Sequence, residues 1–357
     1  MKRKRIFRPT GSGEEDDFQI LAAIVNDTKK QSPGPSTYEE LENWPLWNLQ
    51  CLDARPELAA NFLQMVMQGS LNTTDYSGID CPREVGHQLS LAIAKRKGLD
   101  EGPRFSFVRG CDNSRLPQDV LIQLSKKLDG GRSCVSPDIL ASLSDDTQKF
   151  LEEMEPPAAL RTSERSEDRM QAATMYQTLL EWLITNREWL FPADATFPCL
   201  VHVRNGIRNR CRLDPCGRDP LLDEDDSVLV FNWGGTTCHG WSSVGDSGGF
   251  AHASEKAHAV FLTQRIRMVE LKKEHGFWGE CTVRYPVQVK LAIPLSPWMF
   301  AVWIKADACK MGWPNKRPRM LSFGGDRNRQ ALVVKPFPYF WLVVPKERIA
   351  NLVAGPS

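Results

Sequence analysis

The feature that most constrains the fold of this chain is a repeated order of short strand, turn and helix between Thr74 and Phe323. Short runs of apolar and β-branched residues are each followed by a turn and then by a stretch in which apolar residues recur at helical spacing. Parallel strands need crossover helices of this kind, and the helices then cover both faces of the sheet. The sequence therefore predicts an α/β, Rossmann-like fold with a mostly parallel, doubly wound sheet of six or seven strands.

Apolar spacing also sets the expected position of each element. Strands are expected at 74–77, 105–108, 134–136, 227–231, near 278–281 and at 320–323. Helices are expected at 85–94, 117–128, 139–143, 172–190, 257–273 and about 298–311. These elements make up one domain over residues 71–330, and the spacing at 38–68 predicts a pair of N-terminal helices within residues 37–70.

Three stretches do not follow the repeated order of strand, turn and helix. Residues 1–36 carry five basic residues in the first eight, then an acidic run and a Pro-rich segment, which is typical of a disordered tail. Residues 151–226 mix both charges with proline and end in an acidic loop, so we expect a partly flexible insertion that lies outside the sheet core. Residues 331–357 are left as a C-terminal stub.

Composition excludes several classes of protein. A chain that is 41% apolar and 25% charged can bury a sizeable core, unlike a disordered or fibrous chain. The net charge of +1 means that any electrostatic recognition must be local. No run approaches 18 apolar residues, and the basic start lacks the apolar stretch of a secretory signal. We therefore expect an intracellular protein with reduced cysteines, located in the nucleus or the cytoplasm. The basic run at 2–5 is either a solvated terminus or a nuclear address or nucleic-acid arm.

The loop after one predicted strand carries a candidate nucleophile. The strand ends at Phe231, two glycines follow, and Cys238 lies a few residues further on. Open α/β sheets place ligands and reactive groups beyond the carboxyl ends of their strands. A thiol in such a loop can act as a nucleophile when its pKa is lowered, whereas a buried cysteine there would be inert.

Other predicted strands are also followed by polar side chains. The turn Tyr76-Ser77-Gly78 comes after the first strand, where glycine lets a ligand approach the backbone. Asp112 follows the second strand, where a carboxylate can bind ribose hydroxyls, and Asp138 follows the third strand. Glu280 ends a later strand, and Arg317-Pro-Arg319 precedes another. Each of these is a weak signal alone, and their order along the chain gives them weight.

In this order the motifs resemble those of the cytosine-5 DNA methyltransferase family. Tyr76-Ser77-Gly78-Ile79-Asp80-Cys81 is similar to that family's Phe-x-Gly-x-Gly-Gly loop, with Asp80 and Cys81 in place of two glycines. The segment Gly235 to Ser242 resembles Gly-Pro-Pro-Cys-Gln-x-Phe-Ser, Glu280-Cys-Thr resembles Glu-Asn-Val, and Arg317-Pro-Arg319 resembles the end of Gln-x-Arg-x-Arg.

The resemblance implies a cofactor and a set of residues that bind it. The cofactor would be S-adenosyl-L-methionine, held by the loop Tyr76, Ser77, Gly78 and Ile79. Asp112 would bind the ribose, and Asp138 with Ile139 would lie at the adenine.

The resemblance also implies a covalent mechanism of DNA methylation. Cys238 would be the nucleophile that adds to C6 of cytosine, which makes C5 reactive enough to take up a methyl group. Glu280 would donate a hydrogen bond or a proton to N3, and Arg317 or Arg319 would stabilise the charge that develops on the base.

DNA is therefore the expected partner. The target base must be flipped out of the duplex, which favours a basic surface near the pocket. Residues 305–335 carry eight Lys or Arg against two acids, although this stretch is equally consistent with a solvated face. Family members usually have a target-recognition region after the position of Gly324, where only 33 residues remain here. Either the N-terminal helices take over that function, or a protein partner supplies it, or the chain is a degenerate member.

Three alternatives stay open from the sequence. The domain could bind nucleic acid without catalysis, or its substrate could be RNA. The third is a metal-supported interaction module, because Cys199, His202, Cys211 and Cys216 offer four zinc ligands at an irregular spacing. The expectation set by the resemblance includes no metal in the catalytic site.

Overall fold

The computed structural model describes Met67 and residues 69–78, 80–214, 228–235, 239–242, 248–307, 318–328, 330–333 and 342–345. The expected N-terminal tail and most of the expected N-terminal helices therefore lie outside the described residues. Within the described part of the chain, no helix combines the length and the apolar character needed to cross a membrane.

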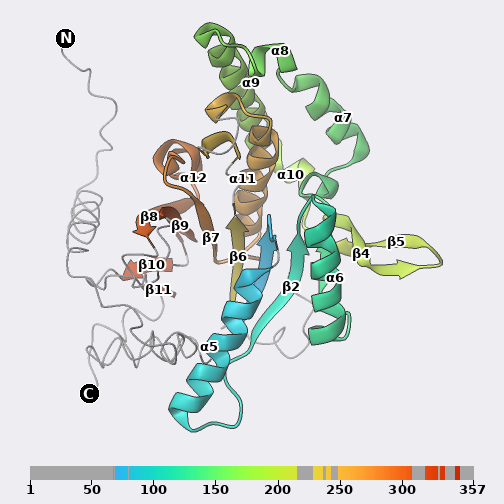
Figure 1. Cartoon of the computed structure of the whole chain (residues 1–357), viewed down its shortest axis with the longest axis vertical. Coiled ribbons are helices and arrows are strands. Elements are labelled where there is room, and N and C mark those ends of the chain that lie inside the picture. Colours follow the sequence, from blue (N-terminus) through green and yellow to red (C-terminus); the bar gives the residue numbers. More distant parts are fainter. Residues whose placement is uncertain are drawn as a thin grey trace.

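Seven of the described strands form one sheet, in the order β3-β2-β1-β6-β7-β9-β8 (Figure 1). Their bounds are β1 (Ser70–Asp75), β2 (Phe105–Cys111), β3 (Cys134–Ser136), β6 (Leu229–Gly235), β7 (Gly276–Thr282), β8 (Met299–Asp307) and β9 (Pro318–Asp326). The five strands from β3 to β7 in this order run parallel, and β9 runs antiparallel to both of its neighbours. The predicted α/β fold with a mostly parallel sheet is confirmed.

Helices cover both faces of the sheet. On one face lie α5 (Cys81–Lys97) and α6 (Arg115–Asp129), whose side chains pack against β2. On the other lie α9 (Ser166–Thr185) and α11 (Ser254–Glu270), which Figure 1 shows side by side. The shorter helical segments are α7 (Asp145–Met154), α8 (Ala158–Arg161), α10 (Arg187–Leu190), α12 (Ile293–Leu295), η1 (Leu140–Ser142), η2 (His239–Trp241), η3 (Gly249–Ala251) and the π-helical η4 (Gln288–Ala292).

Local sequence signals explain where α5 begins and ends. Pro82 occupies its first turn, where a missing N–H costs nothing. Lys95, Arg96 and Lys97 lie in its last turn, where positive charge is favourable next to unpaired carbonyls. The helix ends at Gly98, whose φ of 65° is a left-handed conformation that glycine adopts without strain.

The insertion between β3 and β6 has two structurally different parts. Tyr176, Leu179 and Leu183 of α9 are buried in the same core cluster as α11, so the expectation that residues 151–226 lie outside the core is wrong for this helix. The reason is that its apolar residues recur at three- and four-residue intervals and form a face that must be buried.

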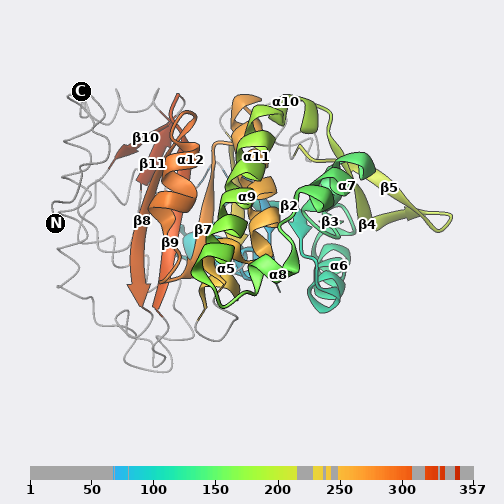
Figure 2. The same cartoon turned by 90° about the horizontal axis from the view of Figure 1, so that it is seen from above.

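The other part of the insertion is a β-hairpin. β4 (Thr196–Arg204) and β5 (Ile207–Arg212) form a separate antiparallel sheet, outside the seven-stranded one as expected. Figure 2 shows this hairpin projecting from the side of the molecule opposite to β8 and β9. Its turn, Asn205-Gly206, has φ values of 52° and 77°, which suit a two-residue hairpin turn.

The helix expected at about 298–311 is a strand, and this prediction is wrong. β8 alternates its side chains, so that Phe300 and Val302 lie in a cluster with Phe323 of β9. Aromatic and β-branched residues at a two-residue period favour a strand over a helix. The helical turns that precede it, η4 and α12, fall just before the predicted range.

The first strand also lies earlier than the predicted 74–77. All six residues of β1 are buried, although four of them are Ser70, Asn72, Thr73 and Thr74. Polar groups can be buried when they are hydrogen-bonded. Asn72 accepts from the Trp233 indole at 2.8 Å, which illustrates how these groups are satisfied inside the sheet.

Four charged side chains are buried together beneath the end of β1. Asp75 is fully buried, with Arg109 of β2 at 3.3 Å and Arg265 of α11 at 3.6 Å. Arg265 also binds Glu274, at 2.6 Å, and Asn232 of β6 donates to Asp75 at 2.7 Å. Two arginines thus neutralise two acids, and the cluster joins three strands to α11.

The charged cluster predicts a large loss of stability when one arginine is removed. Arg265→Met leaves two buried carboxylates short of a partner, so we expect the free energy of unfolding to fall by about 3–5 kcal/mol. Arg115→Met is the control, since Arg115 is 91% exposed in its pair with Asp119, and it should change stability by less than about 1 kcal/mol. Urea denaturation followed by circular dichroism measures the free energy of unfolding of both variants. Equal losses of stability would contradict a stabilising role for the buried charged cluster.

The same cluster predicts a dependence of stability on pH. Burial raises the pKa of Glu274 to about 7, against the opposing effect of Arg265 and Arg109. A carboxyl with a raised pKa in the folded state loses stability as pH rises from its unfolded pKa through its folded one. Glu274→Gln should therefore match the parent near pH 5 and become the more stable of the two by pH 8. Urea denaturation at pH 5 and at pH 8 measures the free energy of unfolding of both proteins. If the difference between them is the same at both pH values, the prediction is wrong.

Candidate cofactor and substrate site

The loop between β1 and α5 holds three residues in left-handed conformations. Tyr76, Gly78 and Asp80 have φ values of 54°, 54° and 61°. Glycine tolerates this region, whereas it costs other residues about 1–2 kcal/mol each. Strained backbone of this kind concentrates at ligand-binding loops, because the surrounding structure must hold it in place. The loop is therefore the first part of a candidate site.

Asp80 is the strained residue at the start of α5, and its carboxylate points into the protein. It is 1% exposed and accepts a hydrogen bond from Arg83 at 2.7 Å, and Arg83 in turn binds Asp129 at 2.6 Å. Burial raises the pKa of Asp80, and the Arg83 guanidinium opposes that rise. The negative charge of Asp80 is thus engaged within the protein.

Asp112 joins the loop after β2 to the loop after β1. One carboxylate oxygen accepts from the Gly78 N–H at 2.9 Å, and the other accepts from the Ser114 N–H at 2.9 Å. Ser77 strengthens the same junction, because its hydroxyl donates to the Cys111 carbonyl at 3.0 Å. A Cβ placed on Gly78 would meet no atom within 4 Å among the described residues, so none of them occupies the space directly above this glycine.

Asp138 brings the loop after β3 to the same edge of the sheet. Its carboxylate accepts from the Leu140 N–H at 3.0 Å and so starts the helical turn η1. Gln118 links this loop to the previous one by donating to the carbonyls of Asp112 and Pro137, both at 2.9 Å. Ile139 is 3% exposed, and its side chain belongs to the hydrophobic core beneath the loop.

Tyr76 forms the floor under the first loop. Its ring lies 6.1 Å from that of Phe261 in α11, and its hydroxyl is buried with no hydrogen-bond partner among the described residues. Burial raises the pKa of the Tyr76 phenol well above its usual range, so the group is a neutral donor. A ligand atom or a water reaching this hydroxyl would satisfy a polar group that is costly to leave unpaired.

The loop that carries Cys238 begins at this edge too. Cys238 itself and Ile79 lie outside the described residues, but β6 ends at Gly235, beside the β1 loop. A Cβ on Gly235 would lie 3.3 Å from the Tyr76 carbonyl oxygen. The expectation that the groups following the strands share one edge is therefore confirmed for Tyr76, Asp112 and Asp138.

Glu280 and Arg319 form an ion pair next to this loop. Glu280 of β7 is in register with Gly235, and its carboxylate lies 2.5 Å from the guanidinium of Arg319. Arg319 is near the start of β9 rather than at the end of a strand. Because β9 is antiparallel to β7, its beginning reaches the edge where the parallel strands end. Arg317 lies outside the described residues.

Two aromatic residues that are not among the predicted site residues, Trp241 and Tyr285, pack together just after the position of Cys238. Trp241, in η2, packs edge-on against Tyr285 at 6.1 Å, and its carbonyl accepts from Thr282 at 3.3 Å. The Tyr285 hydroxyl lies 3.0 Å from His258 of α11, and burial lowers the pKa of His258 to about 4. A neutral histidine and a buried phenol thus support Trp241, in the described segment 239–242, against β7 and α11.

Other predicted binding features are separate from this edge or incompletely described. Of the eight basic residues between 305 and 335, three are described: Lys305, Arg319 and Arg327. Arg327 donates to the carbonyl of Met299. Of the candidate zinc ligands, Cys199, His202 and Cys211 lie on the β4–β5 hairpin, away from the loops after β1, β6 and β7, and Cys216 lies outside the described residues.

Comparison of this chain with models of known protein families and with curated protein sequences found no match.

The junction between the first two loops predicts a local effect of Asp112→Ala. This change removes the acceptor of two backbone N–H groups, and hydrogen bonds to a charged group contribute about 1.5–3 kcal/mol each. Amide exchange should therefore accelerate at Gly78 and Ser114, with a loss of overall stability. Asp119→Ala on exposed α6 is the matched control. Hydrogen–deuterium exchange that stays unchanged around residues 76–80 would contradict the junction.

Proposed function

We propose that this protein is a cytosine-5 DNA methyltransferase that uses S-adenosyl-L-methionine. The observation that carries the proposal is the pairing of Glu280 with Arg319 beside the strand that leads into the Cys238 loop. A carboxyl, an arginine and a cysteine are the three groups that this chemistry requires around the base. Sequence order alone could not say that strands β7 and β9 bring two of them together.

The residues at the first three loops fit the cofactor. No described atom lies directly above Gly78, the loop is strained and the Tyr76 hydroxyl is buried, which together would let a ligand approach the backbone here. Asp112 would hold the ribose, since each carboxylate oxygen accepts one backbone N–H and retains capacity for another hydrogen bond. When bound, S-adenosylmethionine supplies an electrophilic methyl group.

Asp80 supports the same assignment through its backbone. It occupies a position where the family loop has glycine, and its φ of 61° and ψ of 44° are the geometry that glycine adopts most readily. Its carboxylate is held by Arg83 rather than directed at the space above Gly78. A negative charge at this position is therefore compatible with an anionic cofactor carboxylate nearby.

The chain's own residues would act on the base in sequence. The Cys238 thiolate adds to C6 of cytosine, and the electron pair moves to C5, which becomes nucleophilic. Glu280, in its protonated form, gives up part of its contact with Arg319 and donates a hydrogen bond to N3, and Arg319 remains close enough to stabilise the negative charge that develops on the base. After C5 gains the methyl group, a water molecule takes the C5 proton, the electron pair of the C5–H bond re-forms the C5–C6 double bond, and the C6–S bond breaks to return the thiolate.

The exposure of the ion pair suits this role. The Glu280 side chain is 49% exposed and that of Arg319 is 28% exposed, so an incoming base can reach both without unfolding the sheet. A flipped nucleotide would be needed, because C6 cannot be reached inside a stacked duplex. Recognition of the target sequence by a partner protein and a nuclear location stay predictions from the sequence.

Covalent trapping tests the proposed function. With S-adenosylmethionine and duplex DNA that contains 5-fluorocytosine, the parent should form a protein–DNA adduct that survives denaturing electrophoresis, because the fluorine at C5 blocks release of the thiolate. Cys238→Ser should form none yet bind DNA as well as the parent. Glu280→Gln should slow adduct formation without abolishing it, since an amide can donate to the base but cannot give up a proton.

The controls separate the alternatives. Cys309→Ser removes another cysteine of the chain and should leave trapping unchanged. A matched RNA with 5-fluorocytosine tests the other nucleic acid. Full methyl transfer by Cys238→Ser would show that Cys238 is not the nucleophile. If the parent binds DNA but transfers no methyl group, the domain is a nucleic-acid-binding domain and not an enzyme.

A further inference from the structure

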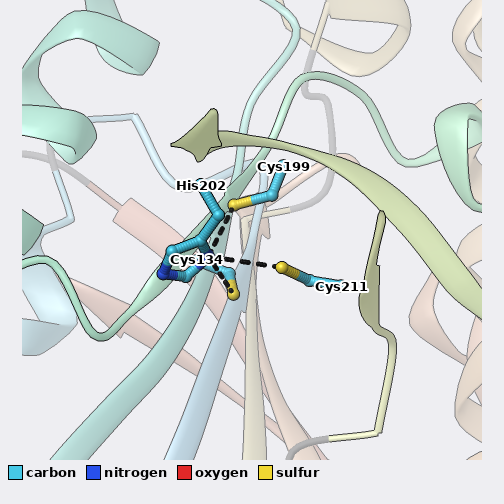
Figure 3. A group of neighbouring side chains, drawn as sticks. All are labelled: Cys134, Cys199, His202 and Cys211. Carbon is cyan, nitrogen blue, oxygen red and sulfur yellow. Dashed lines mark hydrogen bonds between the residues drawn. The ribbon is translucent and has the colours of Figure 1, made fainter. Parts of the chain in front are cut away.

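A cluster of three cysteines and one histidine lies at the edge of the sheet, around strand β3 (Figure 3). Cys134 begins β3, Cys199 and His202 belong to β4, and Cys211 belongs to β5. The four side chains point toward one another, and their sulfur and nitrogen atoms all lie within 4.8 Å of each other. The cluster thus brings together two segments more than sixty positions apart in the chain.

The distances within the cluster are those of ligands around a common centre. The Nδ1 atom of His202 lies 3.5 Å from the sulfur of Cys134, 3.4 Å from that of Cys199 and 3.2 Å from that of Cys211. Zinc bonds of about 2.3 Å to sulfur and about 2.0–2.1 Å to nitrogen, at tetrahedral angles, separate the two ligand atoms by about 3.6 Å. The observed separations come within a few tenths of an ångström of that value.

Hydrogen bonding alone does not account for this arrangement. The other ring nitrogen of His202, Nε2, lies 2.9 Å from the carbonyl oxygen of Gly131. A carbonyl only accepts, so Nε2 carries the proton and Nδ1 of the neutral ring presents a lone pair to the sulfurs. One lone pair can accept from a single S–H group, whereas three sulfurs surround it. A backbone carbonyl that orients the ring in this way is the usual support of a metal-binding histidine.

Two of the three cysteines of the cluster are shielded from solvent. Cys134 is 3% exposed and Cys199 is fully buried, so neither sulfur is simply solvated. No disulfide joins any of the six cysteines in the described part of the chain.

We propose that Cys134, Cys199, His202 and Cys211 bind one zinc ion in a closed, structural site. Three thiolates and an imidazole in a tetrahedral arrangement are a ligand set that zinc takes when no open position is needed for catalysis. The site differs from the one expected from sequence in its fourth ligand, because Cys134 takes the place assigned to Cys216. Cys216 lies outside the described residues.

The ion would fasten the hairpin to the sheet. β3 is only three residues long and forms the edge of the sheet, and β4 packs directly against it. Phe197, at the base of β4, is buried in the main core, but the tip of the hairpin is exposed, with Ile207 at 72% and Val203 at 50% exposure. A two-stranded hairpin is marginally stable by itself. Metal ligands from both of its strands would add the stability that the packing of its side chains does not provide.

Metal analysis of the full-length protein tests the proposal directly. The protein purified without chelator from zinc-supplemented cells should contain about one zinc per chain by plasma mass spectrometry. After exchange, cobalt should give the visible absorption bands of a tetrahedral thiolate site. Absence of zinc, together with failure of cobalt to give those bands, would overturn the proposal.

Single substitutions decide the ligand set. Cys134→Ser and Cys211→Ser should lose at least most of the zinc, whereas Cys216→Ser and the exposed Cys81→Ser should keep it. Retention of zinc by Cys134→Ser with loss by Cys216→Ser would overturn the assignment of the fourth ligand.

A measurement on the parent guards against variants that do not fold. Removal of zinc by a chelator should raise amide exchange selectively at residues 196–212. If zinc removal raises amide exchange equally across the chain, or leaves it unchanged, the metal does not anchor this hairpin.

Discussion

The buried charges around Asp75 are the interaction on which the rest of the structure depends. Asp75 is the last residue of β1, so the cluster lies directly below the loop that begins with Tyr76. Arg265 reaches it from α11 and Glu274 from the segment before β7, which fixes the distance between helix and sheet. Removing charges from water is expensive, and pairing recovers that cost only when the geometry is maintained. The strained loop above therefore rests on a rigid base.

The mixture of parallel strands with the antiparallel strand β9 explains how the candidate site is assembled. Parallel strands deliver the loops after β1, β2, β3 and β6 to one edge. The antiparallel β9 delivers its beginning to the same edge, and Arg319 meets Glu280 there. An arginine motif that precedes a strand and an acid that ends another can thus become neighbours, although the general rule for α/β sheets considers only strand ends.

Sequence reasoning succeeded where hydrophobic periodicity and position relative to strands decide the outcome. The parallel sheet, the bounds of β3 and the shared edge of Tyr76, Asp112 and Asp138 were predictable in this way. It failed at β8, where a strand pattern overlapped a helical one, and at β1, whose buried polar residues hide the strand. The Asn205-Gly206 turn was a usable signal for the hairpin. Cys134 was not predictable as a partner of His202, because only the fold brings β3 against β4.

The order of strands also sets the order in which the chain can fold. β1 pairs with β2 across a short stretch of sequence, whereas Asn232 of β6 bonds Thr73 of β1 across 159 positions. Contacts this distant carry a larger loop-closure entropy and form late. During synthesis, β1, β2 and β3 emerge well before β6, so one edge of β1 remains without its neighbour until the whole insertion has been made. An unpaired strand edge is a site of aggregation, and β1 carries mostly polar residues, which limits that hazard while the chain waits for its central partner.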